Sequence, residues 1–399
     1  METNNQKNDQ NIIPNDADKQ QKGVNVPNLR FREFDDFWLP TTLSSICSFR
    51  KKRKSSIKKF YVSTENILQN YKGIEQYNSN EVISGDEFLI GDILMANIRP
   101  YLKKVYMAEF DGVSNSDVLI FKSDIVDPHF LHCILANDNF INYVMNSVKG
   151  SKMPRGDKIH IMNYHLSIPR TKEQEKIAKF IDLLDQRIDT QSKIIEDLEL
   201  FKKGIENQYF SCNKNNEYVI LGDVITQINN RNEKNIDFEV LSVSNKYGFI
   251  PQSEQFDDHE VASANKSNYK IVKQNDFAYN PARINVGSIA MLRNNQVGIV
   301  SPMYICFRAN NNRILSSYLD YFSHSNKFNN EVLKNLEGSV RLCLSFESLS
   351  KIKIHLPSLD TQYEIVKNLD LISNKISIEN KILEKLKEQK KYLLSNMFI

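Results

Sequence analysis

Two stretches of the chain, 188 residues apart, follow the same pattern. Residues 150–188 read GSKMPRGDKIHIMNYHLSIPRTKEQEKIAKFIDLLDQRI, and residues 338–376 read GSVRLCLSFESLSKIKIHLPSLDTQYEIVKNLDLISNKI. The alignment continues without a gap to Phe210 and Phe398, with 16 identical residues in 61 positions. Because the similarity holds at one fixed offset, it indicates a structural unit that occurs twice in the chain.

The apolar residues after Pro169 and Pro357 recur at alternating steps of four and three, which is the heptad spacing of a coiled coil. Each segment can form a helix of roughly 35–40 residues, about 50–60 Å long. Two ordinary amphipathic helices, each packed on its own core, are the alternative. The matched length and spacing favour pairing of the two helices in an antiparallel arrangement. The predicted helix-pairing residues are Ile177, Ile181, Leu184, Ile188, Ile195, Leu198, Ile365, Leu369, Ile372, Ile376, Leu383 and Leu386.

Upstream of each predicted helix, the sequence alternates between short apolar runs and turn residues, which is typical of short strands with some helix. Leu43–Ile46 corresponds to Leu221–Val224 in the repeat, and Gly91–Leu94 corresponds to Asn275–Ala278. The fold class expected is therefore α+β, with two pseudo-repeated globular domains joined by two long antiparallel coiled-coil helices. The expected boundaries are a disordered polar tail at 1–27, globular domains at 28–168 and 216–356, and long helices at 169–215 and 357–399.

The composition is that of an ordinary globular protein. The 399 residues are 41% apolar and 25% charged, and the net charge of +3 excludes a histone-like polycation. No run approaches 18 consecutive apolar residues, the first residues lack an apolar signal-peptide core, and the five cysteines form no CxxC pair. We therefore expect no membrane segment and a reducing, cytoplasmic location.

Motifs for catalysis are missing from the sequence. It contains no GxxxxGK[ST], GxGxxG or GxSxG motif, and Asn280–Arg283 lacks the second proline and the aromatic residue of an adenine-methylating motif. His129 and His132 could place two metal ligands on one helical face, but no second ligand pair lies near them in the sequence. The sequence therefore predicts neither a catalytic residue nor a metal site.

The most basic segment is residues 50–54, RKKRK, followed by Lys58 and Lys59. A solvated basic loop and a surface that neutralises DNA phosphates are both compatible with it. Further Arg, Lys and Asn residues lie in predicted turns at matching places of the two halves, where Arg can read guanine and Asn adenine. The predicted DNA-binding residues are Lys51, Lys52, Arg53, Lys54, Lys58, Arg99, Lys103, Lys104, Lys152, Arg155, Lys158, Asn280, Arg283 and Arg341.

These features together resemble the DNA-specificity (S) subunits of type I restriction–modification enzymes. The resemblance rests on Leu29–Phe34 with Trp38, on the strand start Gly91–Leu94, and on the Gly-Ser turns at 150 and 338. It also rests on a closing Ile-Pro or Leu-Pro, then a Gln five residues later, then a heptad helix that contains Lys-Lys, in both halves. The resemblance covers about residues 28–399, and the duplicated order of the motifs is its most specific part.

The resemblance implies that each globular domain is a target-recognition domain that reads one half of a bipartite site in double-stranded DNA. The helices would set the spacer and dock two DNA adenine methyltransferase subunits. Restriction and translocase subunits would be further partners. No cofactor is expected in this chain, because S-adenosylmethionine, ATP and Mg would bind to the partner subunits.

Two other functions remain open at this point. The chain could be a coiled-coil structural protein that spaces two protein-binding modules, and salt-dependent DNA binding would distinguish that function from DNA recognition. It could also be an enzyme with an unfamiliar active site, for which activity of the purified chain alone would be the test.

Overall fold

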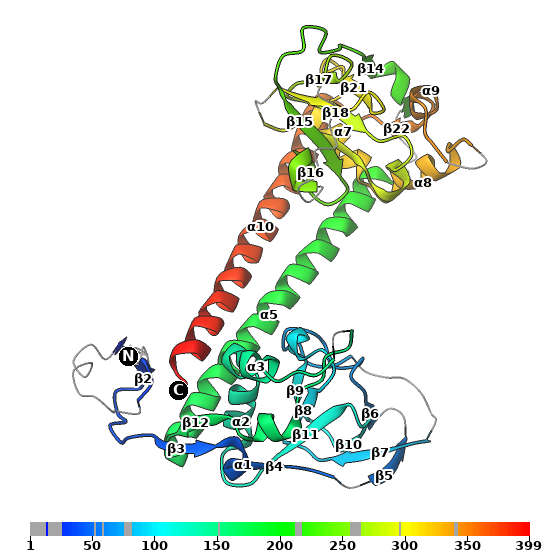
Figure 1. Ribbon diagram of the computed structural model, residues 1–399. Coiled ribbons are helices and arrows are strands. Elements are labelled where there is room, and N and C mark those ends of the chain that lie inside the picture. Colours follow the sequence, from blue (N-terminus) through cyan, green and yellow to red (C-terminus); the bar gives the residue numbers. More distant parts are fainter. Residues whose placement is uncertain are drawn as a thin grey trace, which may run out of the picture. The chain divides into compact units, whose positions relative to one another are not determined.

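The computed structural model describes residues 13–14, 26–51, 53–57, 60–75, 82–150, 152–211, 218–255, 265–294, 297–338 and 342–399. The chain divides into two compact units (Figure 1). Unit 1 contains residues 1–192 and 382–399, and unit 2 contains residues 193–381. Each long helix therefore contributes to both units.

Besides a strand pair near the N-terminus, unit 1 contains two four-stranded sheets, ordered β5-β7-β10-β6 and β4-β11-β8-β9, and a two-stranded sheet, β12-β3. Strand β8 is buried along its whole length because all four of its residues are apolar. The strands are β3 (Leu39–Thr42), β4 (Cys47–Phe49), β5 (Arg53–Ile57), β6 (Tyr61–Val62), β7 (Val82–Phe88), β8 (Ile93–Ala96), β9 (Val105–Met107), β10 (Gly112–Ser114), β11 (Val118–Ser123) and β12 (His165–Ile168). The short helices are α1 (Leu43–Ile46), η2 (Pro100–Leu102), α2 (Pro128–Leu135), α3 (Asp138–Met145) and α4 (Lys158–Met162).

Unit 2 repeats this plan with sheets β14-β21-β18-β19, β16-β15-β20-β17 and β13-β22. Its strands are β13 (Tyr218–Ile220), β14 (Ile225–Ile228), β15 (Glu239–Ser244), β16 (Gly248–Pro251), β17 (Lys270–Val272), β18 (Asp276–Tyr279), β19 (Ile289–Met291), β20 (Gly298–Val300), β21 (Ile305–Ala309) and β22 (Lys353–His355). Its short helices are η3 (Leu221–Asp223), α6 (Gln252–Gln255), η4 (Ile284–Val286), α7 (Ser316–Ser323), α8 (Asn326–Lys334) and α9 (Phe346–Ser350).

The two units share a frame but differ at one sheet edge. Strands β7-β10-β6 of unit 1 correspond to β17-β20-β15 of unit 2, with one antiparallel and one parallel pairing in each set. The fourth strand is β5, which pairs with β7, in unit 1 and β16, which pairs with β15, in unit 2. The additional strand therefore lies on opposite edges of the two equivalent sheets.

The turn before β8 and β18 shows the repeat at atomic detail. Gly91 and Asn275 both have positive φ, 85° and 68°, and each donates its backbone N–H across the turn at 2.8 Å, to Ala108 and Leu292. The next residue is a buried aspartate in both units, Asp92 and Asp276, and each is paired with an arginine. The partners differ, because Arg50 follows β4 in unit 1 and Arg308 lies on β21 in unit 2.

The long helices are α5 (Thr171–Phe210, 40 residues) and α10 (Leu359–Asn396, 38 residues), so the predicted length is confirmed. The Gln of the repeated motif fixes the start of each helix. Gln174 accepts from the backbone N–H of Asp127 at 3.1 Å and donates to Pro169 O at 2.8 Å. In unit 2, Gln362 makes the same contacts with Leu315 and Pro357. This glutamine therefore attaches each long helix to the residue that precedes a short helix, α2 in unit 1 and α7 in unit 2.

All twelve predicted helix-pairing residues are buried or half-buried. In unit 1, the first part of α5 packs with the last part of α10, since Ile177 and Ile181 share a core with Leu386 and Leu393. In unit 2, the last part of α5 packs with the first part of α10, and Phe210 lies in the same core as Ile365 and Leu369. The segments pair in reverse order along the chain, which confirms the antiparallel arrangement.

An ion pair adds to the helix packing of unit 1. Lys390 Nζ on α10 lies 2.5 Å from Asp185 Oδ1 on α5. Burial raises the pKa of Asp185, although Lys390 opposes this effect. The neighbouring His132 on α2 has its pKa lowered to about 4, mainly by burial and further by Lys390 and His129. This histidine is therefore neutral at pH 7.

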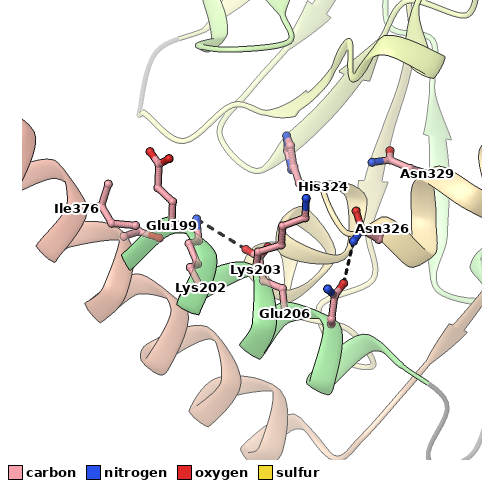
Figure 2. A pocket seen from close by; sticks show the side chains of 10 residues that line it. Glu199, Lys202, Lys203, Glu206, His324, Asn326, Asn329 and Ile376 are labelled. Atoms are coloured by element: carbon pink, nitrogen blue, oxygen red, sulfur yellow. Dashed lines mark hydrogen bonds and ion pairs between the residues drawn. The ribbon is translucent and has the colours of Figure 1, made fainter. Parts of the chain in front are cut away.

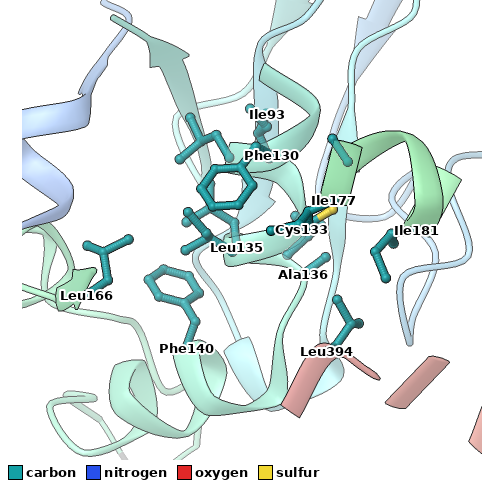
Figure 3. Packing of buried hydrophobic residues seen from close by; sticks show 14 of the residues in the cluster. Ile93, Phe130, Cys133, Leu135, Ala136, Phe140, Leu166, Ile177, Ile181 and Leu394 are labelled. Atoms are coloured by element: carbon teal, nitrogen blue, oxygen red, sulfur yellow. The ribbon is translucent and has the colours of Figure 1, made fainter. Parts of the chain in front are cut away.

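The core of unit 1 joins α2, α3 and the two long helices (Figure 3). Between Pro128 and Met145 the chain forms two helices, α2 and α3, with a break at Ala136 and Asn137. At this break the side chain of Asn137 accepts a hydrogen bond from Asn139 N and so caps the start of α3. The break lets both helices bury apolar residues, Phe130 in α2 and Phe140 in α3.

The N-terminal tail lies largely outside the described residues, so its expected disorder at 1–27 stays an expectation. Ile13–Pro14 (β1) is described and pairs antiparallel with Leu29–Arg30 (β2). Arg30 is buried and forms a two-pronged ion pair with Glu173, in the first turn of α5. The opening motif of the sequence is thus attached to the base of the first long helix.

Candidate nucleic-acid interface

The segments that contain the Gly-Ser turns are closed at their ends by equivalent backbone hydrogen bonds in both units. Lys149 and Arg155 exchange two backbone hydrogen bonds at 3.0 Å, and Glu337 and Cys343 do the same at 2.8 and 2.9 Å. Gly150 and Gly338 begin these loops with φ of 92° and 113°, which glycine adopts without steric cost. We name the segments at 149–155 and 337–343 the reading loops, of which residue 151 and residues 339–341 lie outside the described residues.

Each reading loop is attached to the turn that follows the central strand of its unit. Gly156 N donates to Asn97 O at 3.3 Å in unit 1, and Leu344 N donates to Pro281 O at 3.0 Å in unit 2. In unit 1, the hydrogen bond from Gly156 brings the predicted residue Arg155 close to Arg99. The backbone N–H of Arg99 donates to Pro154 O at 2.8 Å. Residues far apart in sequence thus meet at one end of each sheet.

Arg99 and Arg283 occupy equivalent positions in these turns, each seven residues after the buried aspartate of the strand start. Both side chains are exposed, and neither forms an ion pair with a described residue. Asn280, also predicted, uses its side-chain oxygen to accept from Ala282 N at 3.1 Å and so stabilises the turn in unit 2. The constant feature of the two turns is a free arginine.

Several predicted DNA-binding residues already have partners within unit 1. Lys54 Nζ lies 2.7 Å from Glu87, Lys103 Nζ lies 2.8 Å from Asp138, and Lys104 donates to Thr64 O at 2.6 Å. Lys54 also lies on the edge strand β5, so part of the basic segment is strand and not loop. DNA would have to compete with these contacts.

The uncompensated charges of unit 1 lie elsewhere. A recess of about 230 Å³ is lined by Arg50, Lys51, Asp86, Ser116 and Lys158, among other residues. Arg50 is neutralised by Asp92, which also raises the pKa of that guanidinium. Lys51 and Lys158 are exposed, and neither forms an ion pair within the described ranges. The same holds for Lys152. Among the predicted DNA-binding lysines of unit 1, Lys51, Lys152 and Lys158 thus have no described ion-pair partner, whereas Lys54 and Lys103 are paired.

The remaining predicted residues cannot be placed. Lys52, Lys58 and Arg341 lie outside the described residues, and only the backbone of Arg53, in β5, is described. A residue that the sequence did not single out is Asp117, whose Oδ1 lies 3.1 Å from Arg155 Nη2. The two residues are 38 positions apart, so no local spacing could have revealed this pair.

Unit 2 contains a polar pocket of about 480 Å³ where α5, α10 and α8 meet (Figure 2). Lys202 Nζ lies 3.7 Å from Glu206 Oε1, and burial raises the pKa of Glu206. His324 also lines the pocket. At the equivalent positions of unit 1, Leu394 and Ala136 are packed into the apolar core (Figure 3). The repeat alignment places Glu206 opposite Leu394 and His324 opposite Ala136. Only the structure shows that Glu206 and His324 line a polar pocket.

The described part of the chain offers no cluster of three or more His, Cys, Asp or Glu side chains placed to hold a metal ion. Among those residues, no helix combines the length and the apolar character that a membrane span requires. His129 and His132 lie on α2 as predicted, with His132 held neutral by its surroundings.

The chain thus contains two units of one design, each with an exposed arginine, Arg99 or Arg283, in the turn to which the reading loop is attached. A family model for the type I restriction modification DNA specificity domain matches residues 38–200 and 213–388, one match in each half. The chain belongs to this family of type I restriction–modification specificity subunits.

Individual relatives agree with this assignment. The chain is 31% identical over 107 residues to the type I restriction enzyme EcoDI specificity subunit of Escherichia coli, a match that spans 27% of this chain and 24% of that relative. It is 25% identical over 309 residues to the MjaVIII specificity subunit of Methanocaldococcus jannaschii, covering 69% and 70% of the two chains.

Solved structures show the same fold. A type I R-M system structure, concerned with complex assembly and conformational transition, contains a chain with a TM-score of 0.58 at 17% identity, covering 90% of this chain and 96% of that one. The type I S subunit of M. genitalium gives a TM-score of 0.57 at 15% identity, covering 94% and 99%. As a specificity subunit, the chain is a non-catalytic DNA-recognition protein that associates with other restriction–modification subunits.

Proposed function

We propose that the chain directs its complex to a bipartite DNA site, with one half-site read by each unit. The observation that carries this proposal is the repeated reading loop, which has the same backbone hydrogen bonds in both units but different side chains. Loops whose ends are closed by backbone hydrogen bonds can present side chains to base edges, and different side chains select different bases. One unit would therefore read a sequence that the other does not.

The long helices would set the gap between the half-sites. Helices of 40 and 38 residues are each roughly 60 Å long at 1.5 Å per residue. Half-sites one turn of DNA apart have centres about 34–36 Å from each other. The helices are therefore long enough to act as the spacer between two recognition units.

The outer helix faces would dock two methyltransferase subunits. Unit 1 exposes Leu183 and Ile382, and unit 2 exposes their repeat equivalents, Leu371 and Ile194. Large apolar residues exposed at matching places of a duplicated structure fit two copies of the same partner. These partners would supply S-adenosylmethionine chemistry, restriction and translocase subunits would supply ATP hydrolysis with Mg, and the complex would act in the cytoplasm.

Replacing both Lys51 and Lys158 with alanine is expected to weaken binding to all DNA sequences alike. Both side chains lack an ion-pair partner within the described residues and line the same recess. If each contacts a phosphate, the slope of log K against log salt should become shallower by about 2, since each contact contributes about 0.9. The measurement is a salt titration of DNA binding by the chain assembled with its methyltransferase.

The matched control is the pair Lys54→Ala and Lys122→Ala. Those lysines are compensated by Glu87 and Asp124, so their loss should change the slope less. Equal slopes for both double variants and the unaltered chain would contradict the assignment of Lys51 and Lys158 to phosphates.

A further inference from the structure

We infer that Arg155 reads a guanine in the half-site bound by unit 1, and that Asp117 is the residue that positions its guanidinium. This inference rests on the proposed function, because it assumes that unit 1 reads one half-site. It goes further by assigning one base and one pair of side chains. The argument has three steps: a fixed backbone, an oriented side chain, and a comparison with the equivalent position in unit 2.

The backbone at residue 155 is held on both sides. Arg155 exchanges two hydrogen bonds with Lys149 at 3.0 Å, and the flanking residues Pro154 and Gly156 bond to Arg99 and Asn97. Gly156 allows this close approach, since a Cβ there would lie 2.9 Å from Asn97 Oδ1. A side chain that starts from such an anchored position loses little further backbone freedom on binding.

The side chain is anchored at its far end as well. Arg155 Nη2 lies 3.1 Å from Asp117 Oδ1, while 56% of the arginine side chain remains exposed. The backbone of Asp117, the residue before β11, is itself held in place, because its carbonyl oxygen accepts from Asn97 N at 2.8 Å. The carboxylate engages one nitrogen of the guanidinium, which has five N–H donors in total. Two donors of a planar guanidinium match the O6 and N7 acceptors of guanine.

The comparison between the units separates base reading from phosphate binding. The exposed arginine of the turn is present in both units, as Arg99 and Arg283. At the reading-loop position, unit 2 has Cys343 in place of Arg155. Met303 stands where unit 1 has Asp117, because the pairing of β11 and β21 with their neighbours aligns Val118 with Tyr304. A contact common to all DNA should be retained in both units, whereas a contact specific to one half-site should differ.

The test is an adenine-methylation map of cells that carry the methyltransferase with the unaltered chain, Arg155→Ala, Arg155→Lys or Asp117→Ala. For Arg155→Ala, we expect the preference for guanine at one position of one half-site to fall roughly 5- to 150-fold. The other half-site and the gap should stay unchanged. Arg155→Lys should relax the same position, because an ammonium group cannot form the two-pronged contact, and Asp117→Ala should relax it to a smaller extent.

The matched control is Lys122→Ala, an ion-paired lysine on β11 that lies outside the reading loop and is 48% exposed, which should leave the recognised sequence unchanged. Thermal unfolding of each variant shows that it folds. If the unaltered chain gives no bipartite motif, the proposed function fails. If it gives a motif and the folded Arg155→Ala variant keeps every position, or loses methylation at all sites equally, the assignment of Arg155 is overturned while the proposed function stands.

Discussion

Replacing Glu173 with alanine is expected to destabilise unit 1 by about 3–5 kcal/mol, because it leaves a buried arginine without its counter-charge. Arg30 Nε and Nη2 lie 2.7 and 2.8 Å from the two carboxylate oxygens of Glu173. The side chains are only 4% and 2% exposed. The lost pair also joins β2 to the first turn of α5, so the effect should extend to the base of the long helix.

Trp38 provides the measurement, since it is the single tryptophan of the chain and is buried in unit 1. Its fluorescence during urea unfolding reports on this unit alone. Glu175→Ala is the matched control, two positions further along the exposed side of the same helix, and should stay within about 0.5 kcal/mol of the unaltered chain. The double variant Arg30→Met, Glu173→Leu should recover much of the loss, because an apolar pair can replace a buried ion pair. Equal stabilities of the Glu173 and Glu175 variants would contradict this account.

Exchanging residues 216–356 for the corresponding segment of another family member is expected to change one half-site only. The exchanged segment contains the second reading loop and the sheets that hold it, whereas both long helices and unit 1 upstream of α5 remain. Specific protein–DNA binding exceeds non-specific binding by about 10³–10⁷-fold, so methylation at the original sites should be lost and a new set of sites should appear. The measurement is the methylation map of the exchanged chain.

The reciprocal exchange of residues 28–168 is the control for this prediction. It should change the other half-site and retain the first, with the same gap in both chimaeras because the helices are unchanged. A chimaera that altered both half-sites, or the length of the gap, would show that the units do not read DNA independently.

The long helices could be predicted from the sequence because their packing follows a local period. Steps of four and three place Ile177, Ile181 and Leu184 on one face, whatever lies opposite. The repeat could also be predicted, since the alignment at a fixed offset needs no knowledge of the fold. The break between α2 and α3 could not, because Asn137 caps a helix only when tertiary packing favours a bend at that point.

The charge pattern of the interface was the least predictable part. Whether a lysine is free depends on residues distant in sequence, as Lys104 shows by bonding to Thr64 across 40 positions. Likewise, Arg155 and Asp117 belong to different segments that meet only when the reading loop attaches to the turn after β8. Sequence composition identifies a basic segment, but the fold decides which of its charges remain available to DNA.

The most direct test of the central claim is a whole-genome map of adenine methylation in cells that carry the methyltransferase, with and without this gene. The proposed function predicts a two-part motif with a fixed gap that is methylated only when the chain is present. A map that stays the same after deletion, although the unaltered cells express the protein, would contradict the claim that this chain selects the DNA site.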